Sequence, residues 1–202
     1  QRQMCIRDSY GGFGTKWSEA KKVAGKSLIL ASAGVLLTAF ATGAFCKFVL
    51  RFEWLESLLI GAVISSTDAA SVFSVLRSKK LNLRYGTASI LELESGSNDP
   101  WAYMLTVIIL SVMKGGATAG GFVVSLLAQV FFGVGFGALI SLGAVYLIKR
   151  VRFDAAGFDA IFVTAIAILS YALPSAVGGN GYLSCYIVGI VLGNTKISGK
   201  TA

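Results

Sequence analysis

The chain has 202 residues, of which 55% are hydrophobic and 14% are charged, whereas an average soluble domain has about 25% charged residues; an ordinary water-soluble domain is therefore excluded. The sequence contains no histidine, which excludes a Ser-His catalytic pair, a histidine-ligated metal and an imidazole proton relay. The net charge of +8 comes from basic residues that lie between apolar stretches rather than in one patch, so we expect no nucleic-acid partner.

The two ends of the chain differ from the rest. Residues 1–9 (QRQMCIRDS) resemble a translated sequencing adapter, so we expect a non-native leader there. The last residues, Lys200-Thr201-Ala202, follow an apolar stretch without a closing element. We therefore expect residues 10–202 to be an internal fragment of a longer protein, forming part of a transmembrane domain.

Long apolar stretches follow one another along the chain. Because about 20 apolar residues cross a bilayer as a helix, the sequence predicts an all-α polytopic membrane protein with about six transmembrane helices. Their predicted bounds are Ser27–Leu50, Leu55–Leu76, Gly86–Met113, Thr118–Ile148, Phe158–Leu173 and Gly181–Asn194. Two pairs of glycines spaced four residues apart, Gly133/Gly137 and Gly189/Gly193, predict close helix packing.

Basic residues are distributed unevenly over the connecting segments. Residues 16–26, 77–84, 149–152 and 196–200 hold 13 Lys and Arg, and residues 47–51 and 114 hold three. Cytoplasmic loops carry the excess of Lys and Arg. The alternation therefore predicts that both ends of this chain lie in the cytoplasm.

Four acidic residues fall well inside the predicted helices, away from their ends: Asp68, Glu92, Glu94 and Asp99. A carboxylate at the bilayer centre costs a few kcal/mol, so intramembrane acidic residues indicate functional sites. Asp68 and Asp99 are far enough from the nearest basic loop to reach the middle of the bilayer. Glu92 lies close to that loop, where pairing with a basic residue is the simpler interpretation, and for Glu94 a structural ion pair and a functional role are both open.

The neighbours of the two aspartates are polar and break helices. Three hydroxyl residues, Ser65-Ser66-Thr67, precede Asp68, and Asp99 lies in the run Glu94–Pro100 (ESGSNDP). Backbone that leaves the helix within a membrane must be buried in protein or line a water-filled cavity. We therefore expect two consecutive broken helices that build one oxygen-rich, negatively charged site, suited to an unhydrated alkali cation or a proton.

Three segments also resemble a known family: Gly61–Ala70 (GAVISSTDAA), Glu94–Pro100, and Gly179–Leu183 (GNGYL) together with Gly193-Asn194. They are similar to the monovalent cation/proton antiporters of the NhaP-type branch, most of all to bacterial potassium/proton antiporters, and the likeness extends over nearly everything from Tyr10 onward. It implies a partial transport domain over residues 10–202, with discontinuous crossing helices. It also implies a multi-pass protein of the bacterial inner membrane that forms a homodimer at full length.

The resemblance implies roles for individual residues. Asp99 would be the carboxylate that binds either the cation or the proton, and the Ser95 hydroxyl and the Thr67 carbonyl would be further ligands of the cation. The protein would exchange K⁺ or Na⁺ for H⁺ across the bilayer by alternating access, without a cofactor. Na⁺ and K⁺ need the same oxygen ligands, so the sequence leaves the choice between them open.

Three neighbouring residues would support this site, again by resemblance. Asp68 and Asn98 would stabilise the helix crossing through hydrogen bonds. Asn98 stands where the electrogenic branch of the family has a second aspartate, which implies electroneutral exchange. Glu94 would pair with an arginine on a later helix that this chain does not contain.

Two other classes of protein remain open from the residues alone. An intramembrane aspartyl protease needs two membrane aspartates, which Asp68 and Asp99 could supply. It also needs a Gly-x-Gly-Asp context, which Asn98-Asp99-Pro100 does not provide. A non-transporting structural membrane subunit is the second alternative, but it would not require two carboxylates at matching depth.

Overall fold

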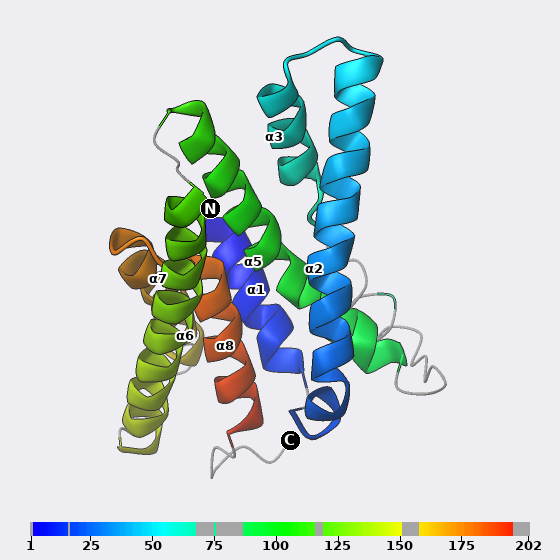
Figure 1. Ribbon diagram of the computed structural model, residues 1–202. Coiled ribbons are helices and arrows are strands. Elements are labelled where there is room, and N and C mark those ends of the chain that lie inside the picture. Colours follow the sequence, from blue (N-terminus) through cyan, green and yellow to red (C-terminus); the bar gives the residue numbers. More distant parts are fainter. Residues whose placement is uncertain are drawn as a thin grey trace. The chain divides into compact units, whose positions relative to one another are not determined.

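The computed structural model describes residues 2–15, 17–67, 75, 87–115, 119–150 and 158–195. The regular elements in these ranges are all α-helices, which confirms the predicted all-α class (Figure 1). The helices are α1 Arg2–Gly14, α2 Trp17–Phe48, α3 Trp54–Ile64, α5 Thr87–Met113, α6 Ala119–Arg150, α7 Phe158–Ala176 and α8 Gly181–Asn194.

The predicted helix bounds agree closely with the observed ones over the second half of the chain. In the first half, α2 begins at Trp17 rather than at Ser27, because Lys21, Lys22 and Lys26 continue the helix beyond its apolar part. The helix expected over Leu55–Leu76 is described only as far as α3 and the three residues after it. An additional helix, α1, spans most of the expected leader; the adapter-like origin of residues 1–9 stays a prediction.

Helix α5 corrects one expectation. It is continuous from Thr87 to Met113 with Pro100 inside it, so the break predicted within Glu94–Pro100 is wrong. A proline inside a helix removes one hydrogen bond and needs room for its ring one turn earlier. Gly96 stands at that position, four residues before the proline. The apolar turns on the C-terminal side then continue the helix.

The chain divides into two compact units, which are described separately. The α3–α5 unit comprises Glu19–Gln129 and holds most of α2, all of α3 and α5 and the start of α6. In it, α2 and α3 run side by side after a short turn (Figure 1). A Cβ on Gly61 of α3 would overlap the Ala39 carbonyl of α2, and one on Gly43 would lie 3.1 Å from the Leu58 side chain. These glycines allow α3 to approach α2 closely.

The α7–α8 unit comprises Gln1–Ser18 and Val130–Ala202. Its helix α8 packs against both α1 and α7. Gly189 and Gly193 of α8 face α1, where an added Cβ would overlap backbone carbonyl oxygens. On α6, Gly133 and Gly137 face α8. A Cβ on Gly133 would lie 2.8 Å from the Asn180 carbonyl oxygen. The close packing predicted from both glycine pairs is therefore confirmed.

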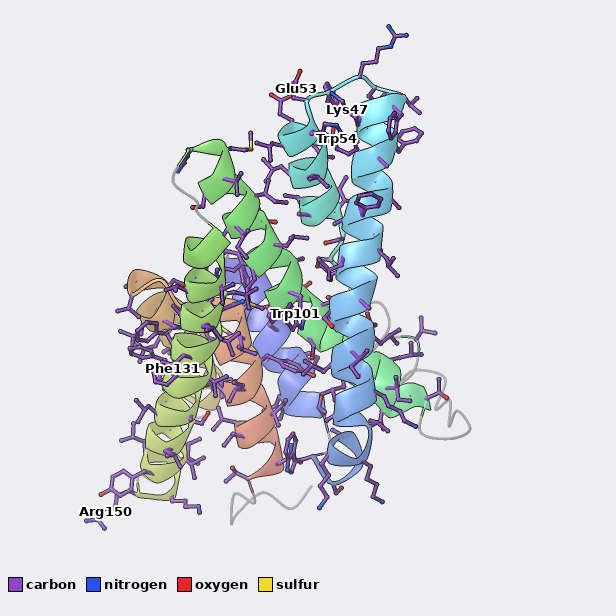
Figure 2. All side chains as sticks on the ribbon, in the orientation of Figure 1. Lys47, Glu53, Trp54, Trp101, Phe131 and Arg150 are labelled. Carbon is purple, nitrogen blue, oxygen red and sulfur yellow. The ribbon has the colours of Figure 1, made fainter. Side chains whose placement is uncertain are left out.

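Apolar side chains face outward on the two longest helices. Within the described residues, the stretches Ala20–Phe48 and Val123–Arg150 are long and apolar enough to cross a bilayer. Leu37 of α2 is 71% exposed and Phe131 of α6 is 75% exposed, and Figure 2 shows Phe131 projecting from its helix. A soluble protein rarely exposes so much contiguous apolar surface, whereas a lipid-facing helix must.

Polar side chains, by contrast, lie inside. In the α3–α5 unit the fully or almost fully buried ones include Ser27, Ser57, Ser65, Ser95, Asn98, Asp99 and Gln129. Charged residues lie at the helix ends, as Figure 2 shows for Lys47 at the end of α2 and Arg150 at the end of α6. This arrangement, apolar outside and polar inside, is that of a protein whose solvent is lipid.

Candidate functional site

The first half of the site is the segment that follows α3. The helix ends at Ile64, and Ser65 still has helical dihedral angles (φ −68°, ψ −14°). Its hydroxyl donates to the Ala62 carbonyl oxygen at 2.7 Å, a local bond that competes with continuation of the helix. Ser66 and Thr67 then lie outside regular secondary structure.

The second half of the site is one face of α5. Ser95, Asn98 and Asp99 are 1%, 1% and 5% exposed, respectively. Residues three and four apart lie on the same face of a helix, so the Ser95 hydroxyl stands one turn before the Asn98 amide and the Asp99 carboxylate. Because the helix is not broken here, its regular geometry sets the spacing of these three groups.

Two side-chain hydrogen bonds join the two halves. The Ser66 hydroxyl donates to Oδ1 of Asp99, and Nδ2 of Asn98 donates to Oγ1 of Thr67. Two consecutive residues after α3 are thus bonded to two consecutive residues of α5. Helices α3 and α5 also pack against each other, so the crossing forms within one compact unit.

Two buried oxygens beside the carboxylate have no hydrogen-bond partner among the described residues: Oγ of Ser95 and Oδ1 of Asn98. Leaving a buried polar group without a partner costs about 1–3 kcal/mol, so such groups in a folded protein call for an explanation, for example a role in ligand binding. Here they stand next to the buried carboxylate of Asp99. Carboxylate, hydroxyl and amide oxygens are the ligands that hard cations prefer.

Glu94 lies at the edge of this cluster. Its side chain is half-buried, and it interacts with the Asn98 side chain one turn later on α5. The Asn98 amide thus stands between Glu94 on its own helix and Thr67 on the facing segment. The arginine expected to pair with Glu94 stays a prediction about a helix that this chain does not contain.

The structure brings together five of the six predicted site residues: Thr67, Ser95, Asn98 and Asp99, with Glu94 at the edge of the cluster. Thr67 contacts Asn98 through its hydroxyl, whereas the prediction concerned its carbonyl. Asp68 lies outside the described residues.

Sequence reasoning did not single out Ser66, which bonds directly to Asp99. It stood in a run of three hydroxyl residues, and nothing in the sequence distinguishes it from Ser65.

This arrangement defines the class of the protein: an all-α, multi-pass membrane protein with a buried, oxygen-lined carboxylate at a helix crossing. Residues 10–202 match the family model described as sodium/hydrogen exchanger, transmembrane. The chain belongs to this family.

Individual relatives agree with that assignment. The K(+)/H(+) antiporter NhaP2 of Shewanella oneidensis is 37% identical over 197 residues, which are 95% of this chain and 33% of that protein. The K(+)/H(+) antiporter NhaP of Alkalimonas amylolytica is 35% identical over 190 residues, 93% of this chain and 33% of that protein. The chain therefore spans about a third of the length of these relatives.

A solved structure has a similar fold. The sodium proton antiporter MjNhaP1 from Methanocaldococcus jannaschii matches with a TM-score of 0.74 over 95% of this chain and 47% of that chain. The two sequences are 24% identical over the match. The likeness extends to the fold, which is that of a membrane antiporter.

Proposed function

We propose that the full-length protein exchanges a monovalent cation, K⁺ or Na⁺, for H⁺ across the membrane. Membership of the exchanger family and the names of the bacterial relatives support this proposal. The observation that carries it is the buried Asp99 carboxylate, which accepts a hydrogen bond from Ser66 and adjoins two oxygens that have no partner in the described part of the chain. An aspartyl protease or a purely structural subunit has no comparable support.

Asp99 is the proposed shared binding group. A carboxylate can hold one proton or contribute to one cation site, and occupation by either disfavours the other. The Ser95 hydroxyl and the Thr67 carbonyl would complete the cation's ligands, while Asn98 and Asp68 would hold the crossing together. Exchange then requires only that the site open to one side of the membrane at a time.

We also propose that the exchange is electroneutral. Asn98, next to Asp99, is an uncharged amide and cannot release a proton. In this proposal Asp99 alone exchanges one cation for one proton, so each half-cycle would move a single positive charge. Measuring whether a membrane potential alters the exchange rate tests this stoichiometry, because an electroneutral exchanger would not respond.

The decisive experiment uses the full-length protein in proteoliposomes that contain a pH-sensitive dye. Addition of K⁺ and of Na⁺, separately and over a range of concentrations, should dissipate a proton gradient if the protein is an exchanger. Asp99→Asn keeps the size of the side chain but removes the exchangeable charge, so it should abolish this signal. Glu53→Gln is the matched control, since Glu53 is exposed in the turn before α3 (Figure 2). Near-normal exchange by Asp99→Asn would overturn the assignment.

The membrane placement is a separate proposal: the bacterial inner membrane, with both ends of this chain cytoplasmic and with the full-length protein a homodimer. In this topology the turn after α2 would face the outside of the membrane and the end of α6 would face the cytoplasm. Glu53→Cys and Arg150→Cys introduce thiols at these two places (Figure 2), and the three native cysteines are buried. A membrane-impermeant thiol reagent added outside intact cells should label the first variant only; the reverse pattern would overturn the topology.

A further inference from the structure

The two adjacent serines after α3 use their hydroxyls differently. Ser65 is buried and donates to the Ala62 carbonyl of its own helix at 2.7 Å. Ser66 donates across to Oδ1 of Asp99 on α5. The first bond ends a helix, whereas the second bond fixes the position of the carboxylate on which the proposed exchange depends.

The bond from Ser66 is compatible with a carboxylate that binds a cation and with one that holds a proton. An ionised carboxylate has about four lone-pair positions, and the serine hydrogen occupies one of them. A hydroxyl donor at one oxygen does not exclude a cation at the same carboxylate, and a protonated carboxyl still accepts at its second oxygen. Ser66 can therefore hold Asp99 in one orientation whether a cation or a proton is bound.

That orientation matters because the remaining ligands are on a rigid helix. Ser95 lies one turn before Asp99 on the continuous helix α5, and its buried oxygen has no partner among the described residues. A cation can contact both groups only when the Asp99 side chain adopts the rotamer that brings its oxygens toward Ser95. A hydrogen bond from the facing segment is a direct means of selecting that rotamer.

We propose that Ser66 is a positioning residue that holds the Asp99 carboxylate in its cation-binding orientation and so sets the affinity for the cation. The proposal rests on the proposed exchange function. Loss of the hydroxyl should weaken cation binding because it removes one restraint on the orientation of the carboxylate, and that restraint must then be supplied on binding. The opening and closing of the site should be affected less, since the backbone crossing and the bond from Asn98 to Thr67 remain.

The test measures the apparent KM for the cation and the maximal exchange rate of the full-length protein in proteoliposomes, with K⁺ and Na⁺ separately. Removal of one hydrogen bond to a charged group in Ser66→Ala should raise the apparent KM about tenfold and change the maximal rate less than about twofold. Ser66→Thr restores a hydroxyl and should return the KM to within about threefold of the native value. Ser65→Ala, which removes the neighbouring hydroxyl, should leave the KM unchanged.

Other outcomes distinguish a failure of the positioning role of Ser66 from a failure of the proposed exchange function. An unchanged KM in Ser66→Ala, or an equal rise in Ser65→Ala, would overturn the positioning role and leave exchange at Asp99 intact. If Ser66→Ala does not fold, Ser66→Thr alone decides the question, because a folded threonine variant with a KM raised tenfold would contradict the proposal. Exchange that survives Asp99→Asn would instead refute the proposed function itself.

Discussion

Asn194 in the α7–α8 unit and Asn98 in the α3–α5 unit carry the same amide group but use it differently. Oδ1 of Asn194 accepts from the Trp17 N–H at 2.8 Å, and its Nδ2 donates to the carbonyl oxygens of Thr15 (2.7 Å) and Ile190 (2.8 Å). The side chain thus ties the end of α8 to the junction between α1 and α2. Each polar atom of this amide has a backbone partner.

The Asn98 amide is more buried and yet less fully bonded. Its Nδ2 donates to the Thr67 hydroxyl, while its Oδ1 has no partner among the described residues. Asn180 in the α7–α8 unit resembles Asn194 rather than Asn98: its Oδ1 accepts from the Leu183 N–H at 3.1 Å and caps α8. Amides with backbone partners stabilise helix junctions, whereas an amide with a spare oxygen beside a buried carboxylate is available to a ligand.

The largest effect is expected at Asn98. Asn98→Leu keeps the number and the branching of the side-chain heavy atoms but removes the bond to Thr67 and the spare oxygen, so exchange should fall about a hundredfold, which corresponds to ~2.7 kcal/mol. The melting temperature of the purified full-length protein should change little, because an unsatisfied polar atom also disappears from the interior. Exchange in proteoliposomes and thermal unfolding in detergent measure the two effects. A variant with a lowered melting temperature and normal exchange would show that Asn98 is a structural amide, like Asn194, and not part of the ion site.

An intermediate effect, on stability alone, is expected at the contact between α6 and α8. In Gly133→Ala the new Cβ would lie 2.8 Å from the Asn180 carbonyl oxygen, and such overpacking costs about 1–3 kcal/mol. Gly135→Ala on the same helix is the control, because nothing lies within 4 Å of its added Cβ. Thermal unfolding should separate the two variants, and the exchange rate per folded molecule should be the same in both. Equal stability would show that the close approach of α6 and α8 is not needed.

The smallest effect is expected at Asn194. Asn194→Leu removes three hydrogen bonds, but the residue is exposed and water or lipid headgroups can replace some of its partners. The free energy of unfolding should fall by about 1 kcal/mol, with no change in the apparent KM for the cation. A changed KM would indicate that the α1–α8 junction influences the ion site, which contradicts the assignment of a purely structural role to this amide.

Several features of the molecule could be predicted because they depend on local sequence. The apolar runs gave helices close to the expected bounds for α5, α6, α7 and α8, since the length of an apolar run and its flanking charges specify a transmembrane helix almost independently of its neighbours. The glycine pairs on α6 and α8 also correctly indicated helix contacts. Asp99 was identified because a carboxylate in an apolar helix is costly wherever it packs.

Other features depended on contacts between distant residues. The run Glu94–Pro100 has the composition of a helix break, yet packing around it keeps α5 continuous. A hydrogen bond between Ser66 and Asp99 joins residues 33 positions apart, so no local pattern distinguishes Ser66 from Ser65, whose bond is to its own helix.

The sequence by itself therefore determined the all-α membrane class of this protein, the helices α5 to α8 and the candidate carboxylate Asp99, because hydrophobic length and the cost of burying charge are properties of single segments. Only the tertiary structure decided which hydroxyl contacts that carboxylate, which oxygens remain without partners and which amides serve as helix caps and ties. Those choices follow from the distances and directions between side chains on different helices.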